Sequence, residues 1–298
     1  MTMALKYPRS QPGRLIRDVA GLFKLRIGSL IMITALAGVA VAPGPSPGAL
    51  QVFALALAVL LASASAGAFN QYFEFESDAL MARTCRRAFV TGALEPSPAW
   101  LVLIGAMLAA AVGLAAFVLN PVSACYVFLG AFFYAVVYSV WLKRRTWLNI
   151  VVGGLAGSFA VLAGAAAVDP AIGLQPALLA LVLFLWTPPH FWSLAIANSA
   201  DYANARVPML PVVVGSACAS WIVFWNTVLL VAVSLLPAVF GAGLIYLAGA
   251  AAGGGYFIAR TWALARAPSR ETAMRAFLAS LVQLSVLLVA AFIDSAGG

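Results

Sequence analysis

The chain has 298 residues, of which 64% are hydrophobic and only 9% are charged. A soluble protein of this length needs far more charged residues to cover its surface, so the composition excludes an ordinary soluble domain. We assign the net charge of +8 to membrane orientation rather than to nucleic acid, because basic residues gather in the cytoplasmic loops of membrane proteins.

Apolar runs separated by polar breaks predict an all-α integral membrane protein with about nine transmembrane helices, since a helix needs about 20 residues to cross the hydrocarbon. The predicted spans are residues 27–42, 49–70, 98–118, 122–141, 148–167, 174–197, 219–238, 242–262 and 275–293. Ala40-Val41-Ala42 resembles a signal-peptide cleavage site, but Pro43 follows it directly, so we interpret the first span as a retained helix. Residues 1–298 are predicted to form a single transmembrane domain, with 1–23 as a cytoplasmic N-terminal segment.

The loops between these spans divide by charge. Every Lys and Arg lies in one alternating set, near residues 6–26, 83–87, 143–145, 206 and 260–275. The other set, near 43–48, 119–121, 168–173 and 239–241, carries Asp169 as its only charged residue. The positive-inside rule therefore predicts a cytoplasmic N-terminus and a C-terminus on the outside.

The first polar constellation follows the second span. Asn70, Glu74 and Asp78 are spaced i, i+4, i+8, so a continuing helix places them on one face. Three oxygen donors on one face suit Mg²⁺, whose remaining ligands are water and phosphate oxygens. Three basic residues follow that are able to bind an anion: Arg83, Arg86 and Arg87. The alternative is a solvated helix end with ordinary charge pairs, but the membrane depth of Asn70 favours a functional site.

The second constellation lies at the end of the sixth span and just beyond it. Pro188 and Pro189 stand inside the span, which predicts a break in the helix with unpaired carbonyls at that depth. His190, the only histidine, follows them and is flanked by aromatic residues. It is interpreted either as a partner of a freed carbonyl or as part of a binding site. Asp201 follows within residues 201–211.

A third feature is the basic run that follows Tyr138. It consists of Lys143, Arg144 and Arg145. By itself this run predicts membrane orientation and contact with lipid phosphate.

These segments, in this order, resemble the UbiA superfamily of intramembrane prenyltransferases. The family motif Asn-x-x-x-Asp-x-x-x-Asp-x-x-Met-x-Arg-Thr is matched by Asn70, Glu74, Asp78, Met81, Arg83 and Thr84. The pattern Thr-Pro-Pro-His-Phe-Trp followed by Asp-Tyr-x-x-Ala-x-Val-Pro-Met-Leu-Pro resembles the branch of the superfamily that acts on heme. It stands complete at residues 187–192 and 201–211. The resemblance covers the chain from about residue 24 to the last span.

The resemblance implies a Mg²⁺-dependent transfer of a farnesyl group from farnesyl diphosphate to the 2-vinyl group of heme b, with addition of water. It implies that Asn70, Glu74 and Asp78 hold one Mg²⁺ and that Asp201 holds a second, with Asn70, Asp78 and Asp201 as the catalytic set. Residues expected to bind the diphosphate are Arg83, Arg87, Lys143 and Arg144. Those expected to line the heme and prenyl pocket are Phe69, Tyr72, His190, Phe191 and Trp192. The expected location is the bacterial cytoplasmic (inner) membrane, in contact with lipid and with a downstream heme A synthase as a candidate partner.

The sequence departs from the family pattern at two site positions. Glu74 stands where the family has Asp, and Ala205 leaves Asp201 as the single carboxylate of the second motif. If the helix of the sixth span continues, Asn198, Asp201 and Ala205 share one face.

Three other readings remain open at this point. They are a UbiA-type enzyme acting on an aromatic acceptor such as 4-hydroxybenzoate, a membrane transporter or heme carrier, and an assembly factor without catalysis. The first leaves residues 187–192 and 207–211 unexplained, and the carrier has no need of three aligned oxygen ligands. The assembly factor is supported only by Glu74 and Ala205.

Overall fold

The computed structural model describes residues 18–297, and within this range every regular element is helical, which confirms the predicted all-α class. In the described part of the chain, seven helical stretches are long and apolar enough to cross a membrane. They are α3 (Ala49–Asp78), α4 (Pro98–Val118), α5 with η1 (Pro121–Phe132 and Phe133–Leu142), α6 with α7 (Asn149–Gly153 and Leu155–Val168), α8 (Leu174–Ala197), α11 (Ser216–Val239) and α13 (Arg270–Gly297). The chain is thus a multi-pass membrane protein.

Two further helices coincide with predicted spans. α2 (Leu25–Val41) is apolar but has only 17 residues. α12 (Leu244–Arg266) has 23 residues, but it contains three consecutive glycines and Arg260 and is not among the seven stretches that are apolar enough. The count of nine transmembrane helices therefore stays a prediction. Most of the predicted cytoplasmic segment 1–23 lies outside the described residues.

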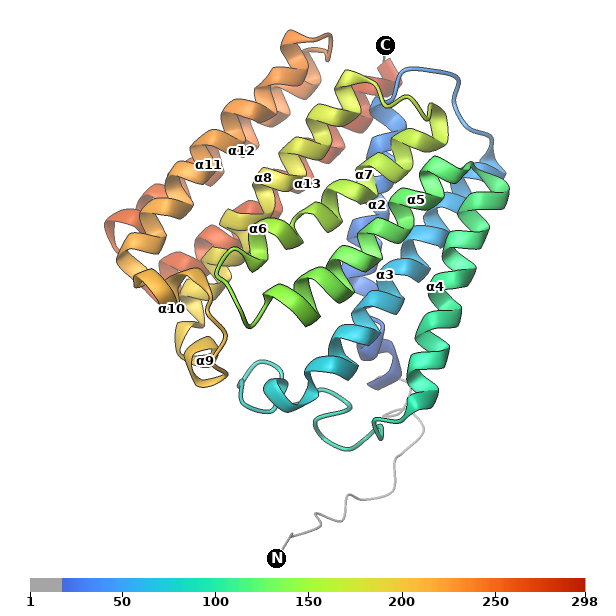
Figure 1. The fold of residues 1–298 in the computed structure, drawn as a ribbon. Helices are drawn as coiled ribbons and strands as arrows, with labels where there is room; N and C mark the ends of the chain where they lie inside the picture. Colours follow the sequence, from blue (N-terminus) through green and yellow to red (C-terminus); the bar gives the residue numbers. More distant parts are fainter. Residues whose placement is uncertain (1–17, 298) are drawn as a thin grey trace, which may run out of the picture.

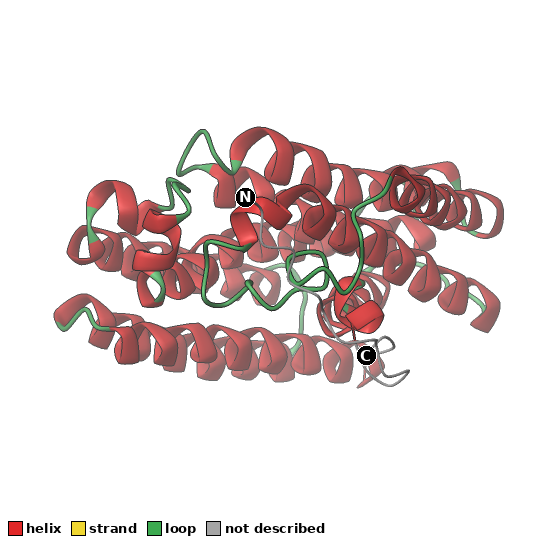
Figure 2. Ribbon diagram, turned by 90° about the horizontal axis from the view of Figure 1, so that it is seen from below, coloured by secondary structure: helices red, strands yellow, loops and turns green. Residues whose placement is uncertain are grey.

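The helices form a bundle with the loops gathered at its two ends (Figure 1, and Figure 2 from below). α2 packs against α3, α7 and α13. α8 packs against α7, α11 and α13, and α12 packs against α11 and α13. The segment that follows α3 and the short helices α9 (Ser199–Asn204) and α10 (Leu210–Val214) lie at the same, lower end in Figure 1. Two of the predicted basic loops, near residues 83–87 and 206, thus share one end of the bundle.

α2 and α7 cross at van der Waals contact because each contributes a glycine. A Cβ added to Gly38 would collide with the Val161 carbonyl, and one added to Gly164 would collide with the Ala35 carbonyl. Small residues are the usual means by which membrane helices bring their backbones together. Any side chain at either glycine would force these helices apart.

The fourth and fifth predicted spans are less regular than expected. η1 is a π-helix, in which the Lys143 N–H donates to the Tyr138 carbonyl at 2.9 Å. The fifth span is divided at Gly154, where an added Cβ would lie 3.0 Å from the Thr187 Cβ. Inserted π turns are often found at functional sites, and this one lies beside the polar end of α3.

The predicted break at the two prolines of the sixth span is wrong, because α8 is helical through Pro188 and Pro189. Side-chain hydroxyls supply hydrogen bonds around them: Thr187 Oγ1 donates to the Leu183 carbonyl at 2.9 Å, and Ser193 Oγ donates to the Pro189 carbonyl at 2.7 Å. Such hydroxyls are known to support proline-containing membrane helices.

α8 ends instead at Ala197, because Asn198 leaves the helical region with φ −125° and ψ 32°. The expected continuation of this helix, which would have placed Asn198, Asp201 and Ala205 on one face, is therefore wrong. Asp201 belongs to the separate short helix α9.

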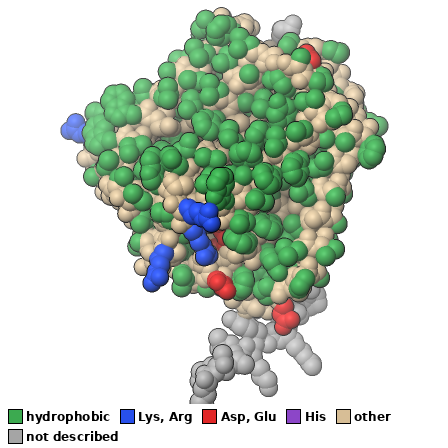
Figure 3. Space-filling view, in the orientation of Figure 1, with side chains coloured by type: hydrophobic (Ala, Val, Ile, Leu, Met, Phe, Trp, Pro, Cys, Tyr) green, Lys and Arg blue, Asp and Glu red, His purple; other side chains and the backbone are tan. Residues whose placement is uncertain are grey.

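The outer surface fits a lipid environment. On the face shown in Figure 3, apolar side chains dominate, and most of the visible Lys, Arg, Asp and Glu side chains lie toward the lower end of the bundle. Many large apolar side chains are exposed on the protein surface, among them Phe117 at 93%. Lipid rather than water is the solvent that such a surface requires.

Candidate functional site

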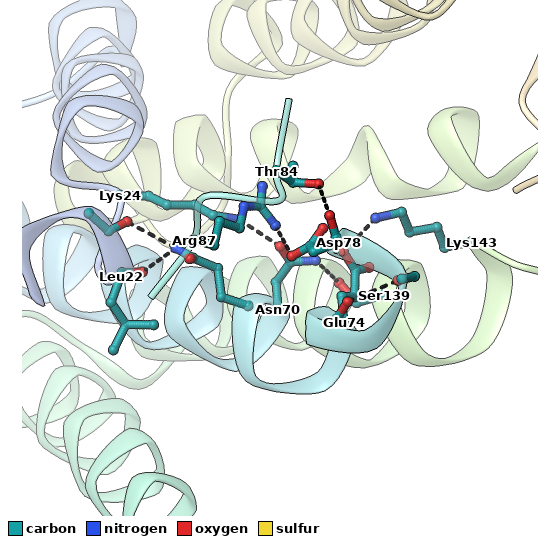
Figure 4. Close-up of polar contacts among 12 residues, drawn as sticks. Leu22, Lys24, Asn70, Glu74, Asp78, Thr84, Arg87, Ser139 and Lys143 are labelled. Carbon is teal, nitrogen blue, oxygen red and sulfur yellow. Dashed lines mark hydrogen bonds and ion pairs between the residues drawn. The ribbon is translucent and has the colours of Figure 1, made fainter. Parts of the chain in front are cut away.

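The predicted trio on α3 forms one buried cluster (Figure 4). Asn70, Glu74 and Asp78 are only 3%, 2% and 1% exposed. They share a face because α3 stays helical to Asp78, eight residues past the predicted end of the span. Three polar side chains at this depth need partners from other elements.

Each member of the trio contacts a basic side chain. Lys143 Nζ lies 2.5 Å from Glu74 Oε2, and Arg87 Nη1 forms an ion pair with Asp78 Oδ2. Lys24 Nζ donates to Asn70 Oδ1 at 2.6 Å. The cluster thus brings together α3, the end of η1, the start of α2 and the loop after α3 (Figure 4).

One oxygen of the Glu74 carboxylate and one of the Asp78 carboxylate have no hydrogen-bond partner. Glu74 Oε1 and Asp78 Oδ1 are buried and accept no hydrogen bond from any described residue. Buried unpartnered carboxylate oxygens one helical turn apart fit a bound cation, since such atoms are otherwise costly. No group of three or more His, Cys, Asp or Glu side chains between residues 18 and 297 fits a metal ion, so any cation here needs additional ligands.

Lys24 was not among the residues predicted for the site. Its backbone is left-handed, with φ 48°, and its amine also donates to the Tyr134 hydroxyl at 3.0 Å. Burial, followed by the positive charge of Arg87, lowers the pKa of Lys24 to about 7.

η1 supplies a second group of residues that sequence reasoning missed. Asn70 Nδ2 donates to Ser139 Oγ at 3.0 Å. The rings of Tyr134 and Tyr138 stack at 5.8 Å, and Lys143 Nζ lies 5.8 Å from the centre of the Tyr138 ring. The π turn cannot be read from the sequence, so nothing there indicated that these side chains face α3.

The loop after α3 folds back onto the helix end. Thr84 Oγ1 donates to the Asp78 carbonyl at 2.9 Å, and this fold returns Arg87 to Asp78. Arg144 is exposed while its neighbour Lys143 is buried. Of the four residues predicted to bind diphosphate, Arg87 and Lys143 therefore contact the trio. Arg83 and Arg144 do not.

Arg83 and Asp201 lie elsewhere, in a cavity of about 740 Å³. Its polar lining also includes Asn198 from the end of α8 and Arg270 from the start of α13. The Asp201 carboxylate makes no hydrogen bond or ion pair with any described residue, whereas Asn198 Nδ2 donates to the Leu194 carbonyl at 2.8 Å. The second predicted metal ligand is thus open to this cavity, unlike the enclosed trio.

His190 is buried between aromatic rings. Its ring stacks on Trp186 at 4.2 Å and on Phe277 at 4.6 Å, and its Nδ1 lies 2.6 Å from Ser280 Oγ. The Ser280 hydroxyl on α13 is its hydrogen-bond partner, so the interpretation that it satisfies a carbonyl freed by the prolines is wrong.

The other predicted pocket residues fall into separate clusters. Phe69 and Tyr72 pack against the apolar cluster that contains Phe89. Trp192 packs near Trp147, with ring centres 6.2 Å apart, and the neighbouring residue 191 is 37% exposed. The structure therefore does not bring Phe69 and Tyr72 into one pocket with residues 191 and 192.

Comparison with known proteins identifies the class to which this fold and cluster belong. Residues 31–287 match the UbiA prenyltransferase family, and the chain belongs to that family. It is a membrane-embedded prenyltransferase.

Curated relatives narrow the class further. The chain is 53% identical over 279 residues to "Protoheme IX farnesyltransferase 2" of Paramagnetospirillum magneticum, covering 94% of this chain and 97% of that one. It is 39% identical over 284 residues to "Protoheme IX farnesyltransferase" of Idiomarina loihiensis, covering 93% of each.

Solved structures share the fold at lower identity. A digeranylgeranylglyceryl phosphate synthase matches with a TM-score of 0.79 and 18% identity, covering 95% of this chain and 99% of that one. A UbiA homolog from Archaeoglobus fulgidus bound to GPP and Mg²⁺ matches with a TM-score of 0.68 and 15% identity, covering 91% and 99%. These likenesses establish the arrangement of the helices.

Proposed function

We propose that this chain is a protoheme IX farnesyltransferase, or heme O synthase. It would transfer a farnesyl group from farnesyl diphosphate to the 2-vinyl group of heme b, with addition of water. The observation that carries the proposal is the 53% identity over nearly the full length of both chains with a relative of that name. The buried trio on α3 provides matching chemistry.

The basic side chains around the trio would bind the diphosphate. Arg87 and Lys143 each neutralise a carboxylate now, and an arriving anion offers both a second partner. When the allylic C–O bond breaks, negative charge develops on the departing diphosphate. Guanidinium and ammonium groups already fixed beside it would stabilise that charge, which is commonly the largest contribution to catalysis. Arg83 and Arg144 are assigned to the same anion from the cytoplasmic edge.

Mg²⁺ is the proposed cofactor. Asn70, Glu74 and Asp78 would hold one ion, because Glu74 Oε1 and Asp78 Oδ1 are buried without a partner. Asp201, whose carboxylate is unpaired within the described residues, would hold a second. Bound Mg²⁺ supplies further neutralisation of the leaving diphosphate. A structural relative bound to GPP and Mg²⁺ supports this choice of metal.

The acceptor and the prenyl chain need an apolar environment, since the allylic cation must meet the vinyl group before water does. We assign His190, Phe191 and Trp192 of α8 to the acceptor side. Phe69 and Tyr72 lie in the separate cluster on α3, and we assign them to the prenyl chain.

The test is the mass of the porphyrin product. Membranes containing the chain, supplied with heme b, farnesyl diphosphate and Mg²⁺, should yield a heme heavier by one farnesyl group plus water. Membranes without the chain provide the control. Prenylation of 4-hydroxybenzoate with heme left unchanged would contradict the proposal and support the aromatic-acceptor alternative.

We further propose that the chain lies in the bacterial inner membrane with its basic loops in the cytoplasm. The segregation of every Lys and Arg into alternating loops supports this orientation. A cysteine at exposed Arg145 should react with an impermeant maleimide only in permeabilised cells, whereas one at exposed Ala171 should react in intact cells. The reverse pattern would invert the orientation.

A further inference from the structure

The amide of Asn70 can serve a metal ion in only one of its two orientations. Its oxygen is a ligand that Mg²⁺ accepts, whereas its NH₂ group is a donor of hydrogen bonds and no ligand. A turn of about 180° around the last side-chain bond exchanges the two groups with almost no change in shape. The site therefore needs contacts that keep the oxygen, and not the nitrogen, toward the ion.

Ser139 of η1 selects the orientation from the nitrogen end of the amide (Figure 4). Its hydroxyl has a single proton, and Oγ donates that proton to the Tyr134 carbonyl at 2.9 Å. Toward Asn70, at 3.0 Å, the same Oγ is left only to accept a hydrogen bond. Because only the NH₂ group of an amide donates, Ser139 requires Nδ2 on its side and excludes Oδ1.

Lys24 selects the same orientation from the oxygen end. Its Nζ donates to Asn70 Oδ1 at 2.6 Å and to the Tyr134 hydroxyl at 3.0 Å. A closed chain of hydrogen bonds thus runs through four residues: Asn70, Ser139, Tyr134 and Lys24. An amide oxygen has two acceptor positions, so its contact with Lys24 leaves one for a metal ion.

We propose, on the basis of the Mg²⁺ site in the proposed function, that Ser139 is a positioning residue that holds the Asn70 oxygen toward the metal. It acts through Asn70, with which it shares a buried contact in which both residues are 3% exposed. Without the Ser139 oxygen, the NH₂ group loses its acceptor and the amide is free to turn. Partners that hold a metal ligand in place commonly contribute about 10- to 100-fold to metal affinity.

The alternative is that the Ser139 hydroxyl only stabilises the π turn. Other buried serines donate to a carbonyl of their own helix, as Ser234 Oγ does to the Val231 carbonyl at 2.8 Å. Ser139 also accepts from a side chain of another helix, Asn70 on α3. The two explanations differ once the amide is replaced by a group whose two ends are identical, because orientation then has no effect on metal binding.

Asn70→Asp provides that symmetry, since either oxygen of a carboxylate binds a metal. The comparison uses four chains: the unmodified protein, Ser139→Ala, Asn70→Asp, and Asn70→Asp combined with Ser139→Ala. Each full-length chain is purified in phosphatidylcholine nanodiscs and titrated with Mn²⁺ alone, with free Mn²⁺ measured by its electron paramagnetic resonance signal. Without diphosphate the titration reports on the enclosed site, because Asp201 as a single carboxylate holds an ion weakly.

Ser139→Ala should weaken Mn²⁺ binding by about tenfold. In the Asn70→Asp background the same substitution should change the affinity by less than about twofold, because Ser139 acts only through the amide. Ser234→Ala on α11 is the matched control and should also stay within about twofold. Thermal unfolding reports that each chain is folded. If Ser139→Ala does not fold, Ser139→Cys replaces it, since a thiol is a weak acceptor of similar size.

The proposal is overturned by an unchanged Mn²⁺ affinity in Ser139→Ala. It is also overturned by an equal loss in the Asn70 and Asn70→Asp backgrounds, which would assign Ser139 to the π turn alone. An unmodified chain that binds no Mn²⁺ would overturn the enclosed metal site together with the role of Ser139. Heme farnesylation is measured separately, so a chain that binds Mn²⁺ as expected but prenylates another acceptor contradicts only the proposed function.

Discussion

The two segments predicted to hold metal ions lie in different surroundings. The trio on α3 is enclosed, and each of its members contacts a basic side chain. Asp201 is half-buried on the short helix α9 and opens onto a cavity. The sequence predicts a continuing helix through each of the two segments. Asn70, Glu74 and Asp78 form a cluster because α3 stays helical through all three positions. α8 ends before Asp201, so Asp201 lies on a separate helix.

The difference indicates separate tasks for the two segments. Glu74 Oε1 and Asp78 Oδ1, which are buried without partners in the enclosed site, suit an ion that stays bound between turnovers. A single carboxylate at an open cavity holds Mg²⁺ weakly until phosphate oxygens complete the shell. We therefore expect the second ion to bind together with the diphosphate, and the predictions below test this contrast.

Asp78→Ala should cause the largest loss. It removes a buried carboxylate that no neighbour on the same helix face replaces, so turnover should fall by about 10²- to 10³-fold. The measurement is farnesyl transfer by purified protein at saturating substrates. Glu76→Ala, which changes an exposed carboxylate on the same helix, is the control and should stay near the unmodified rate. Retention of a tenth of the activity by Asp78→Ala would exclude an essential role for the enclosed site.

Asp201→Asn should reduce turnover by about 10²-fold, because it removes one stabiliser of leaving-group charge, worth about 3 kcal/mol. Heme binding, followed by absorbance, should be unchanged. Asp169→Asn, an exposed aspartate in the loop before α8, is the matched control. If Asp201 serves only as a polar residue near a helix end, its replacement costs about 1 kcal/mol of stability and turnover stays near normal, leaving the trio as the whole site.

Lys24→Met should act mainly on donor binding. The amine contacts Asn70 without neutralising a carboxylate, so we expect it to be available to the diphosphate. Its loss should raise the KM for farnesyl diphosphate about tenfold, which corresponds to about 1.4 kcal/mol. Arg26→Met, two residues along and exposed, controls for general loss of positive charge. Equal effects of the two substitutions would assign Lys24 to overall electrostatics.

Glu74→Asp should have the smallest effect, with activity within about threefold of the unmodified chain. It keeps the charge and restores the carboxylate usual in the family, and Lys143 is long enough to follow the shorter arm. The initial rate across a Mg²⁺ titration checks both turnover and metal affinity. A folded but inactive Glu74→Asp protein would show that the enclosed site depends on the extra methylene.

Features that depend on hydropathy or on helical spacing could be predicted from the sequence. The all-α class, the positions of the spans and the shared face of Asn70, Glu74 and Asp78 belong to this kind. Features that depend on backbone irregularity could not be. The π turn that directs Ser139 toward Asn70 has no sequence signature, and the prolines of α8 suggested a break that packing and hydroxyl donors prevent.

The α2–α7 crossing has a consequence for how the chain is made. Gly38 on α2 meets a carbonyl of α7, and α2 also packs against α13 near the other end of the chain. During synthesis α2 enters the bilayer early, yet two of the surfaces it must contact emerge only much later. Contacts so distant in sequence are slow to form. α2 therefore cannot complete its contacts until α13 has been inserted.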